Sequence, residues 1–169
     1  VGDTLGALNL NVLSQLEIRY SRQKTPLHAH LDFTLVWDKP RLAVRILEVK
    51  SMENLPNTPY ASHAIQVQGQ VGLLHKLWNR PVFSLRSSDG TLLHENVTFP
   101  QLCKARFGLT FPDEPQNVSL EGWLLCLSMK ETCAFGPYVY DAQALQYTLE
   151  YARNFWTDMQ ALQDGTLSL

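Results

Sequence analysis

The sequence has no long apolar run, few cysteines and no excess of charge of either sign. A helix that crosses a membrane needs about 20 apolar residues in succession, so no membrane span is expected. No basic stretch followed by an apolar one marks a signal peptide. Three cysteines, an odd number without metal-ligand spacing, are typical of reduced thiols in an intracellular protein, nuclear or cytoplasmic if eukaryotic. The net charge of −2 gives no general basic field, so nucleic-acid binding would depend on a local patch.

Several catalytic signatures are also absent. The chain has no Gly-x-Ser-x-Gly nucleophile elbow, no glycine-rich phosphate loop, no dinucleotide fingerprint and no Cys-x-x-Cys pair. The common serine-hydrolase, nucleotide-dependent and dithiol chemistries therefore have no support in this sequence. Any catalytic site has to be sought among charged residues within the predicted core.

Apolar periodicity predicts the order helix, two strands, helix, two strands, helices. The predicted helices cover 5–21, 60–78, 118–130 and, after a capping residue Asp141, about 142–162. The predicted strands cover 29–37, 42–51, 81–86 and 91–99, the last two forming a hairpin around an Asp-Gly turn. Residues 100–118 are predicted to be irregular apart from a short helical turn. We expect one α/β (α+β) domain over 1–169, with a central mixed sheet flanked by helices.

The hairpin predicted over 29–51 carries charge within apolar strands. Asp32 interrupts the first strand, and Glu48 and Lys50 interrupt the second. Charged side chains are almost never buried without a partner or a metal. If the strands pair, Asp32 comes beside Glu48, and two close carboxylates repel unless a cation lies between them. Mg²⁺ suits such a place, with the Val49 carbonyl as a further ligand, and Lys50 could orient an attacking water.

Asp32 followed by Glu48-x-Lys50, sixteen residues later and on an adjacent predicted strand, resembles the PD-(D/E)xK nuclease superfamily. The resemblance covers 5–99 and implies a restriction-endonuclease-like core there, followed by a C-terminal helical region over 100–169. Leu31, not Pro, precedes Asp32, and no downstream signature identifies a subfamily.

The same resemblance implies supporting residues in the flanking helices. In that family a helix that often carries a Glu precedes the two strands, and a helix that often carries a Gln follows them. Glu17 matches the first of these positions in this sequence. Gln66, Gln68 and Gln70 are candidates for the second. Gln66 and Gln70 are one helical turn apart and could both face the site, and of the two we narrowly prefer Gln66.

The function implied is a metal-dependent endo- or exonuclease-type phosphodiesterase that hydrolyses nucleic acid, DNA rather than RNA. Asp32, Glu48 and the Val49 carbonyl would bind Mg²⁺ or Mn²⁺. Lys50 would serve the nucleophilic water, and Glu17 and Gln66 would have secondary roles. Basic residues in neighbouring segments are candidate phosphate contacts, namely Arg19, Arg22, Lys24 and Arg45.

Other interpretations stay open. The domain could be a catalytically inactive nuclease-like module for binding protein or nucleic acid, as in an effector or a complex subunit. It could also be a plain α+β scaffold, with Glu48 and Lys50 as an exposed edge pair. His28 and His30 share a predicted strand face with Asp32, which would suit zinc or manganese, although strand histidines are more often structural or exposed. The aromatic residues near the C-terminal end are predicted to pack helices, namely Tyr138, Tyr140, Tyr147, Tyr151, Phe155 and Trp156.

Overall fold

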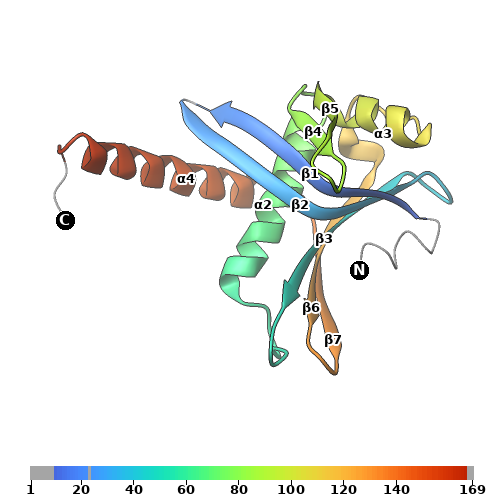
Figure 1. The fold of residues 1–169 in the computed structure, drawn as a ribbon, viewed down its shortest axis with the longest axis horizontal. Helices are drawn as coiled ribbons and strands as arrows, with labels where there is room; N and C mark the ends of the chain where they lie inside the picture. Colours follow the sequence, from blue (N-terminus) through green and yellow to red (C-terminus); the bar gives the residue numbers. More distant parts are fainter. Residues whose placement is uncertain (1–9, 23, 167–169) are drawn as a thin grey trace.

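The computed structural model describes residues 10–22 and 24–166, and over this range it contains one seven-stranded mixed sheet and three helices (Figure 1). The strands are β1 (Asn11–Arg22), β2 (Thr25–Trp37), β3 (Ala43–Ser51), β4 (Phe83–Arg86), β5 (Leu92–Val97), β6 (Ser119–Leu127) and β7 (Thr132–Tyr138). The helices are α2 (Ala61–Leu77), α3 (Phe99–Phe107) and α4 (Ala142–Gln163). The sheet order is β5-β4-β1-β2-β3-β6-β7, with β3 and β6 parallel and the other pairs antiparallel. The predicted mixed α/β class is confirmed.

The helix predicted over 5–21 is wrong where the structure describes it, because Asn11–Arg22 forms β1. The remaining part of that prediction, 5–9, lies outside the described residues. Leu13, Leu16 and Ile18 are buried in one core cluster, and the step of three between the leucines imitates helical spacing. Gln15 has a φ of 55°, outside the β region, so the strand changes phase between the two leucines. The local irregularity, not a helix, explains the pattern.

The helix predicted over 118–130 is also wrong. Ser119–Leu127 is β6, an interior strand that pairs in parallel with β3, and the loop predicted after it contains β7. Alternate residues of β6 are buried and the residues between them are half-buried. Both sides of the strand are therefore largely apolar, which hides the period of two. The C-terminal helical region predicted over 100–169 is corrected accordingly, because two of the seven strands lie within it.

Helix α2, predicted over 60–78, crosses the sheet and packs directly on the backbone of β6. Gly122 makes this approach possible, because a Cβ there would lie 2.6 Å from both Val67 Cγ1 and Val71 Cγ2. The contact holds the middle of the helix over β3. The side chains of Gln66 and Gln70, one turn apart, consequently reach the buried side of that strand.

The chain between α2 and β6 contains more regular structure than predicted. The predicted hairpin is present as β4 and β5, and it leads into α3 where only a short helical turn was expected. Thr98 and Gln101 form a capping box at the start of α3, and Gly108 ends the helix with a φ of 70°. Phe99 packs against Trp78, Phe83 and Phe111, which ties α3 to the end of α2.

Helix α4 extends away from the rest of the molecule (Figure 1). The Asp141 side chain caps it by accepting hydrogen bonds from two backbone N–H groups, as predicted. The buried residues of this helix are Leu145 and Leu149. The prediction that the aromatic residues pack helices is wrong for those that are exposed on α4, namely Tyr147, Tyr151, Phe155 and Trp156. In the described part of the chain, no helix has the length and apolar character needed to cross a membrane.

Candidate functional site

The candidate site lies where β2 and β3 separate. Phe33 and Leu47 form the pair nearest to the site in that antiparallel ladder, one step from Asp32 and Glu48. Beyond it, the Asp32 carboxylate replaces the partner strand and accepts a hydrogen bond from the backbone N–H of Val49 at 2.9 Å. Gln15 of β1 donates to the other oxygen of Asp32 at 3.4 Å. The structure therefore places the Asp32 carboxylate against the backbone between Glu48 and Lys50.

Glu48 is the buried carboxylate of this group, with 2% of the residue exposed. Its Oε1 accepts hydrogen bonds from Lys50 Nζ at 2.7 Å and Gln66 Nε2 at 2.6 Å. Its Oε2 accepts from Gln70 Nε2 at 2.8 Å. A buried carboxylate is costly without such donors, so the lysine and the two glutamines account for the presence of a charge inside the sheet.

The three candidate glutamines differ in their hydrogen-bond partners. Gln66 and Gln70 both bind Glu48, and Gln70 also donates to the backbone carbonyl of His30 at 3.0 Å. Gln68 points elsewhere and donates to the carbonyl of Val139. Helical spacing explains the result, because residues four apart lie on one face of a helix and the residue between them does not. The expectation that Gln66 and Gln70 could both face the site agrees with these contacts, and the preference for Gln66 over Gln70 has no counterpart in them.

The donor set at this site fits a hard divalent cation. Two carboxylates, with the Val49 backbone between them, provide the oxygen ligands that Mg²⁺ and Mn²⁺ accept. Gln70 Oε1 is a further oxygen that is buried and has no hydrogen-bond donor. The Lys50 side chain, which is 26% exposed, places its ammonium 2.7 Å from Glu48 Oε1 and supplies a positive partner for the buried carboxylate.

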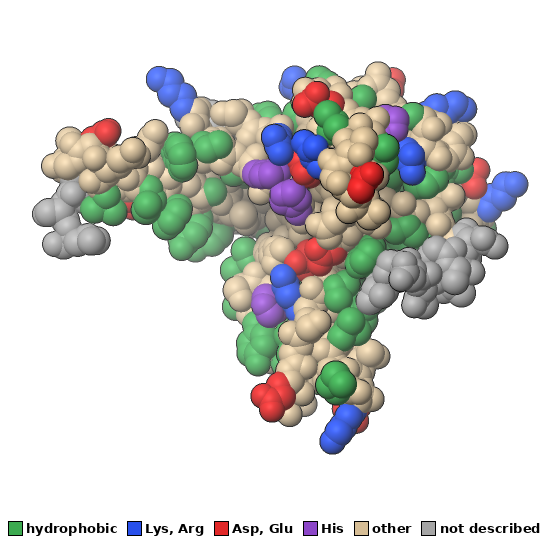
Figure 2. All heavy atoms as spheres, viewed as in Figure 1, with side chains coloured by type: hydrophobic (Ala, Val, Ile, Leu, Met, Phe, Trp, Pro, Cys, Tyr) green, Lys and Arg blue, Asp and Glu red, His purple; other side chains and the backbone are tan. Residues whose placement is uncertain are grey.

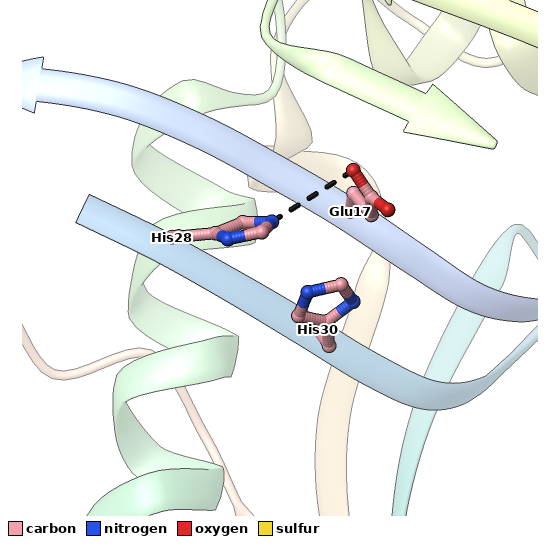
Figure 3. A group of neighbouring side chains, drawn as sticks. All are labelled: Glu17, His28 and His30. Carbon is pink, nitrogen blue, oxygen red and sulfur yellow. Dashed lines mark ion pairs between the residues drawn. The ribbon is translucent and has the colours of Figure 1, made fainter. Parts of the chain in front are cut away.

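Glu17 belongs to a second, adjacent group and lies on β1 instead of the predicted helix. Its carboxylate is close to both histidines of β2, as Figure 3 shows, with Oε2 3.7 Å from His28 Nε2. Glu17 pairs with His30 across the β1–β2 ladder. One ligand atom from each of Glu17, His28 and His30 lies within 4.8 Å of the others, a set that could hold a transition metal. The structure thus groups the histidines with Glu17, where the sequence suggested Asp32.

Two arginines already occupy the surroundings of Glu17. Arg19 Nη2 lies 3.0 Å from Oε2, and Arg86 Nε of β4 lies 3.6 Å from Oε1. No sequence pattern pointed to Arg86, because its strand β4 lies far along the chain from β1 and no spacing connects the two. Gln15 was missed for the same reason: a polar residue in a strand becomes part of the site only through pairing with β2.

The predicted phosphate contacts do not all converge. Arg19 lies next to Glu17, and Lys24 is exposed in the turn between β1 and β2. Arg45 is structural, because it forms an ion pair with Glu121 at 3.0 Å and lies over the Trp37 ring. The side chain of Arg22 lies outside the described residues.

Comparisons with known proteins leave the function open. No protein-family model and no curated protein sequence matches the chain. Among solved structures, the crystal structure of SSO0001 is similar over 95% of this chain and 55% of that one, with 11% sequence identity and a TM-score of 0.48. The chain thus spans about half the length of that protein.

Proposed function

We propose that this chain is a metal-dependent nuclease domain of the PD-(D/E)xK type that hydrolyses phosphodiester bonds in DNA. The observation that carries the proposal is the convergence of Asp32 and the buried Glu48 on either side of the Val49 backbone, with Lys50 beside them. Residues from two strands and a helix assemble this group. Four residues expected from the sequence lie in this group, namely Asp32, Glu48, Lys50 and Gln66. Gln70 also belongs to it, whereas Glu17 lies in the neighbouring group.

Each residue of the group has a role that follows from its contacts. Asp32, Glu48 and the Val49 carbonyl would hold Mg²⁺ or Mn²⁺, which supplies Lewis-acid activation of a water and of the phosphate when bound. With that ion bound, Glu48 would not need Lys50 as its positive partner. The Lys50 ammonium can instead hold the attacking water and face the negative charge that develops on the phosphate. Gln66 and Gln70 act as positioning residues by fixing both oxygens of Glu48.

Metal titration followed by calorimetry tests the site. Wild-type protein is expected to bind Mg²⁺ or Mn²⁺ with millimolar or tighter affinity, and Glu48→Ala is expected to remove the binding. Glu131→Ala, which removes an exposed carboxylate in the β6–β7 turn, is the matched control and should bind as the wild type does. A wild-type protein that binds neither ion would contradict the proposal.

Cleavage of plasmid DNA, with RNA as the comparison substrate, tests the activity. Lys50→Ala is expected to lower the rate by about 100-fold or more, the usual effect of removing one group that stabilises transition-state charge. Lys130→Ala, an exposed lysine in the β6–β7 turn, should leave the rate unchanged. Metal binding without cleavage by the wild type would favour the second candidate function.

That second candidate is a catalytically inactive nuclease-like module that binds a protein or nucleic acid. The exposed aromatic residues on α4 favour it, because a helix that extends from the body with Tyr147, Tyr151 and Phe155 uncovered is suited to contact a partner. The two candidates share the fold and differ in whether Asp32 and Glu48 bind a metal and cleave.

A further inference from the structure

We infer that the surface around Glu17 binds phosphate groups of the nucleic-acid strand, with Arg19 and Arg86 as direct contacts and His28 beside them. We call this set the arginine surface: Arg19, His28, His30 and Arg86 around the buried Glu17. The inference rests on the proposed function, because it names how that site would hold its substrate. It assigns the group in Figure 3 to an anion and not to a metal.

The arginine surface is assembled by three strands around one carboxylate. Glu17 is 7% exposed and comes from β1, as does Arg19, while His28 comes from β2 and Arg86 from β4. The carboxylate lies 3.0 Å from the Arg19 guanidinium and 3.6 Å from that of Arg86. Glu17 thereby acts as a positioning residue that fixes two cations from different strands next to each other.

Both guanidinium groups keep donors for a ligand. The Arg19 and Arg86 side chains are 59% and 43% exposed, although each has an ion-pair contact with Glu17. Arg86 Nη1 also donates to the Gly90 carbonyl at 3.1 Å, which leaves its Nη2 group for a ligand. A guanidinium has five N–H donors in a planar fork, and a phosphate can accept two of them at once. Two guanidinium groups and one carboxylate leave a net charge of +1 even with neutral histidines. The surface is therefore locally positive in a chain whose net charge is −2.

A metal ion suits the same residues less well. A cation between Glu17 and the histidines would lie close to both guanidinium groups and would be repelled by them. Glu17 Oε2 is buried without a hydrogen-bond donor, but the carboxylate has ion-pair contacts with Arg19 and Arg86, so its charge has two positive partners without a metal. Asp32 and Glu48 differ, because within the described residues Lys50 is the one basic side chain that forms an ion pair with either carboxylate.

The arginine surface is continuous with the candidate catalytic group. One hollow is lined by Arg19 and His28, and a second by His28, His30, Gln66 and Gln70. The third hollow is lined by residues of both groups, including Gln15, Glu17, His30 and Arg86. The first and second hollows share His28 and the second and third share His30, so they lie side by side, and we call this row of hollows the path. Figure 2 shows Lys, Arg and His side chains gathered on this face over β1 and β2, with acidic side chains next to them.

The path connects the two groups through hydrogen-bonded residues. Gln66 and Gln70 in the second hollow bind Glu48, and Gln15 in the third binds Asp32. A strand lying along the path would place one phosphate at the carboxylates while Arg19 and Arg86 hold phosphates nearby. Phosphate contacts of this kind set the register of a strand without reading its sequence.

The test measures binding of a fluorescein-labelled single-stranded DNA by anisotropy, with EDTA present so that no cleavage occurs. Arg19→Ala and Arg86→Ala are each expected to weaken binding about tenfold, the value of one charge-assisted hydrogen bond. Each should also lower the slope of log K against log salt by about 0.7, as expected for one lost phosphate contact on a single strand. Arg106→Ala, an exposed arginine on α3, is the control and should change neither quantity.

Two further variants guard against misfolding. Arg19→Lys and Arg86→Lys keep the charge but lose the planar fork, so they should keep most of the salt slope while affinity falls. Slopes that are equal in the wild type, both alanine variants and the control would overturn the inference. Stoichiometric Zn²⁺ binding in equilibrium dialysis, lost in His28→Ala and kept in Glu48→Gln, would also overturn it and assign the group to a metal.

The outcomes separate this inference from the proposed function. Loss of salt slope in the arginine variants without any cleavage by the wild type would support the arginine surface and reject the nuclease. Cleavage by the wild type with unchanged slopes in the variants would support the nuclease and reject the arginine surface.

Discussion

Glu48 shows how a single buried charge organises this site. Its donors come from its own strand and from a helix that begins ten residues after that strand ends. Gln70 has two acceptors, Glu48 Oε2 and the carbonyl of His30, and so connects α2 with both strands that form the site. Removing a donor from a buried acceptor costs more than the hydrogen bond itself contributes, because the acceptor is left without water.

Gln70→Ala should therefore destabilise the protein by about 1–3 kcal/mol, since Glu48 Oε2 and the His30 carbonyl each lose a donor. Gln68→Ala is the matched control, because its hydrogen bond to Val139 lies at the surface, and its effect should stay within about 0.5 kcal/mol. Urea unfolding monitored by circular dichroism measures both variants. Equal decreases in the free energy of unfolding of the two variants would show that the hydrogen bond from Gln70 to Glu48 stabilises the protein no more than a surface hydrogen bond does.

The cysteines also differ residue by residue. Cys103 is fully buried in α3, and burial raises the pKa of its thiol to about 12. Because the thiolate is the reactive form, this thiol should be inert at mildly alkaline pH.

We expect iodoacetamide to leave Cys103 unlabelled in the folded protein and to label it after unfolding in urea, as read by peptide mass spectrometry. Half-buried Cys133 is the internal comparison and should be labelled faster. Labelling of Cys103 in the folded protein at the rate of Cys133 would show that α3 opens readily, in conflict with its packing against the core.

Among the helices and strands, α2 has the largest effect on the site, because its position determines whether Gln66 and Gln70 reach Glu48. The helix approaches β6 closely because Gly122 has no side chain, and this approach brings Gln66 and Gln70 over β3. Gly69, on α2 itself, has more room. A Cβ at Gly69 of α2 would lie 3.7 Å from Thr148 Cγ2, an ordinary contact.

Substitution by alanine is expected to have opposite effects on stability at Gly122 and Gly69. Gly122→Ala should destabilise by about 1–3 kcal/mol, because the new methyl overlaps Val67 and Val71 and forces the helix outward. Gly69→Ala should stabilise by up to about 1 kcal/mol, because alanine is the better residue inside a helix and has room there. Thermal unfolding compares the two with the wild type. A stable Gly122→Ala variant would mean that α2 is not held against β6 as described.

For the whole molecule, the sheet is completed by strands that lie late in the chain. β3 has β2 on one side and β6 on the other, so residues 119–127 cover what would otherwise be an open edge next to Glu48. Val67 and Val71 of α2 also pack on this late strand at Gly122. The site therefore depends on parts of the chain that the sequence resemblance over 5–99 does not include.

A fragment that ends at residue 99 should accordingly fail to fold, because it lacks β6 and β7 and exposes the face of α2 that packs on them. A fragment that ends at residue 140 keeps all seven described strands and lacks α4, and it should unfold cooperatively at a lower temperature than the full chain. Circular dichroism melts and amide NMR dispersion distinguish the two. A cooperative transition in the shorter fragment would contradict the single-sheet description.

The sequence by itself determined the local features. The charged positions Asp32, Glu48 and Lys50, the second predicted helix, the β4–β5 hairpin and the Asp141 cap all follow from residue type and short-range spacing. It failed for β1 and β6. In β1 the irregular Gln15 imitates a helical step, and in β6 apolar residues on both sides hide the alternation.

Only the tertiary structure decided which distant residues meet. Strand pairing brought Gln15 to Asp32 and Arg86 to Glu17, and packing of α2 on the sheet brought the helix face with Gln66 and Gln70 to Glu48. The physical reason is that a buried carboxylate is satisfied by whichever donors the sheet and helix deliver to it. Which donors reach a carboxylate depends on contacts between residues far apart in the chain, and these contacts cannot be predicted from local spacing.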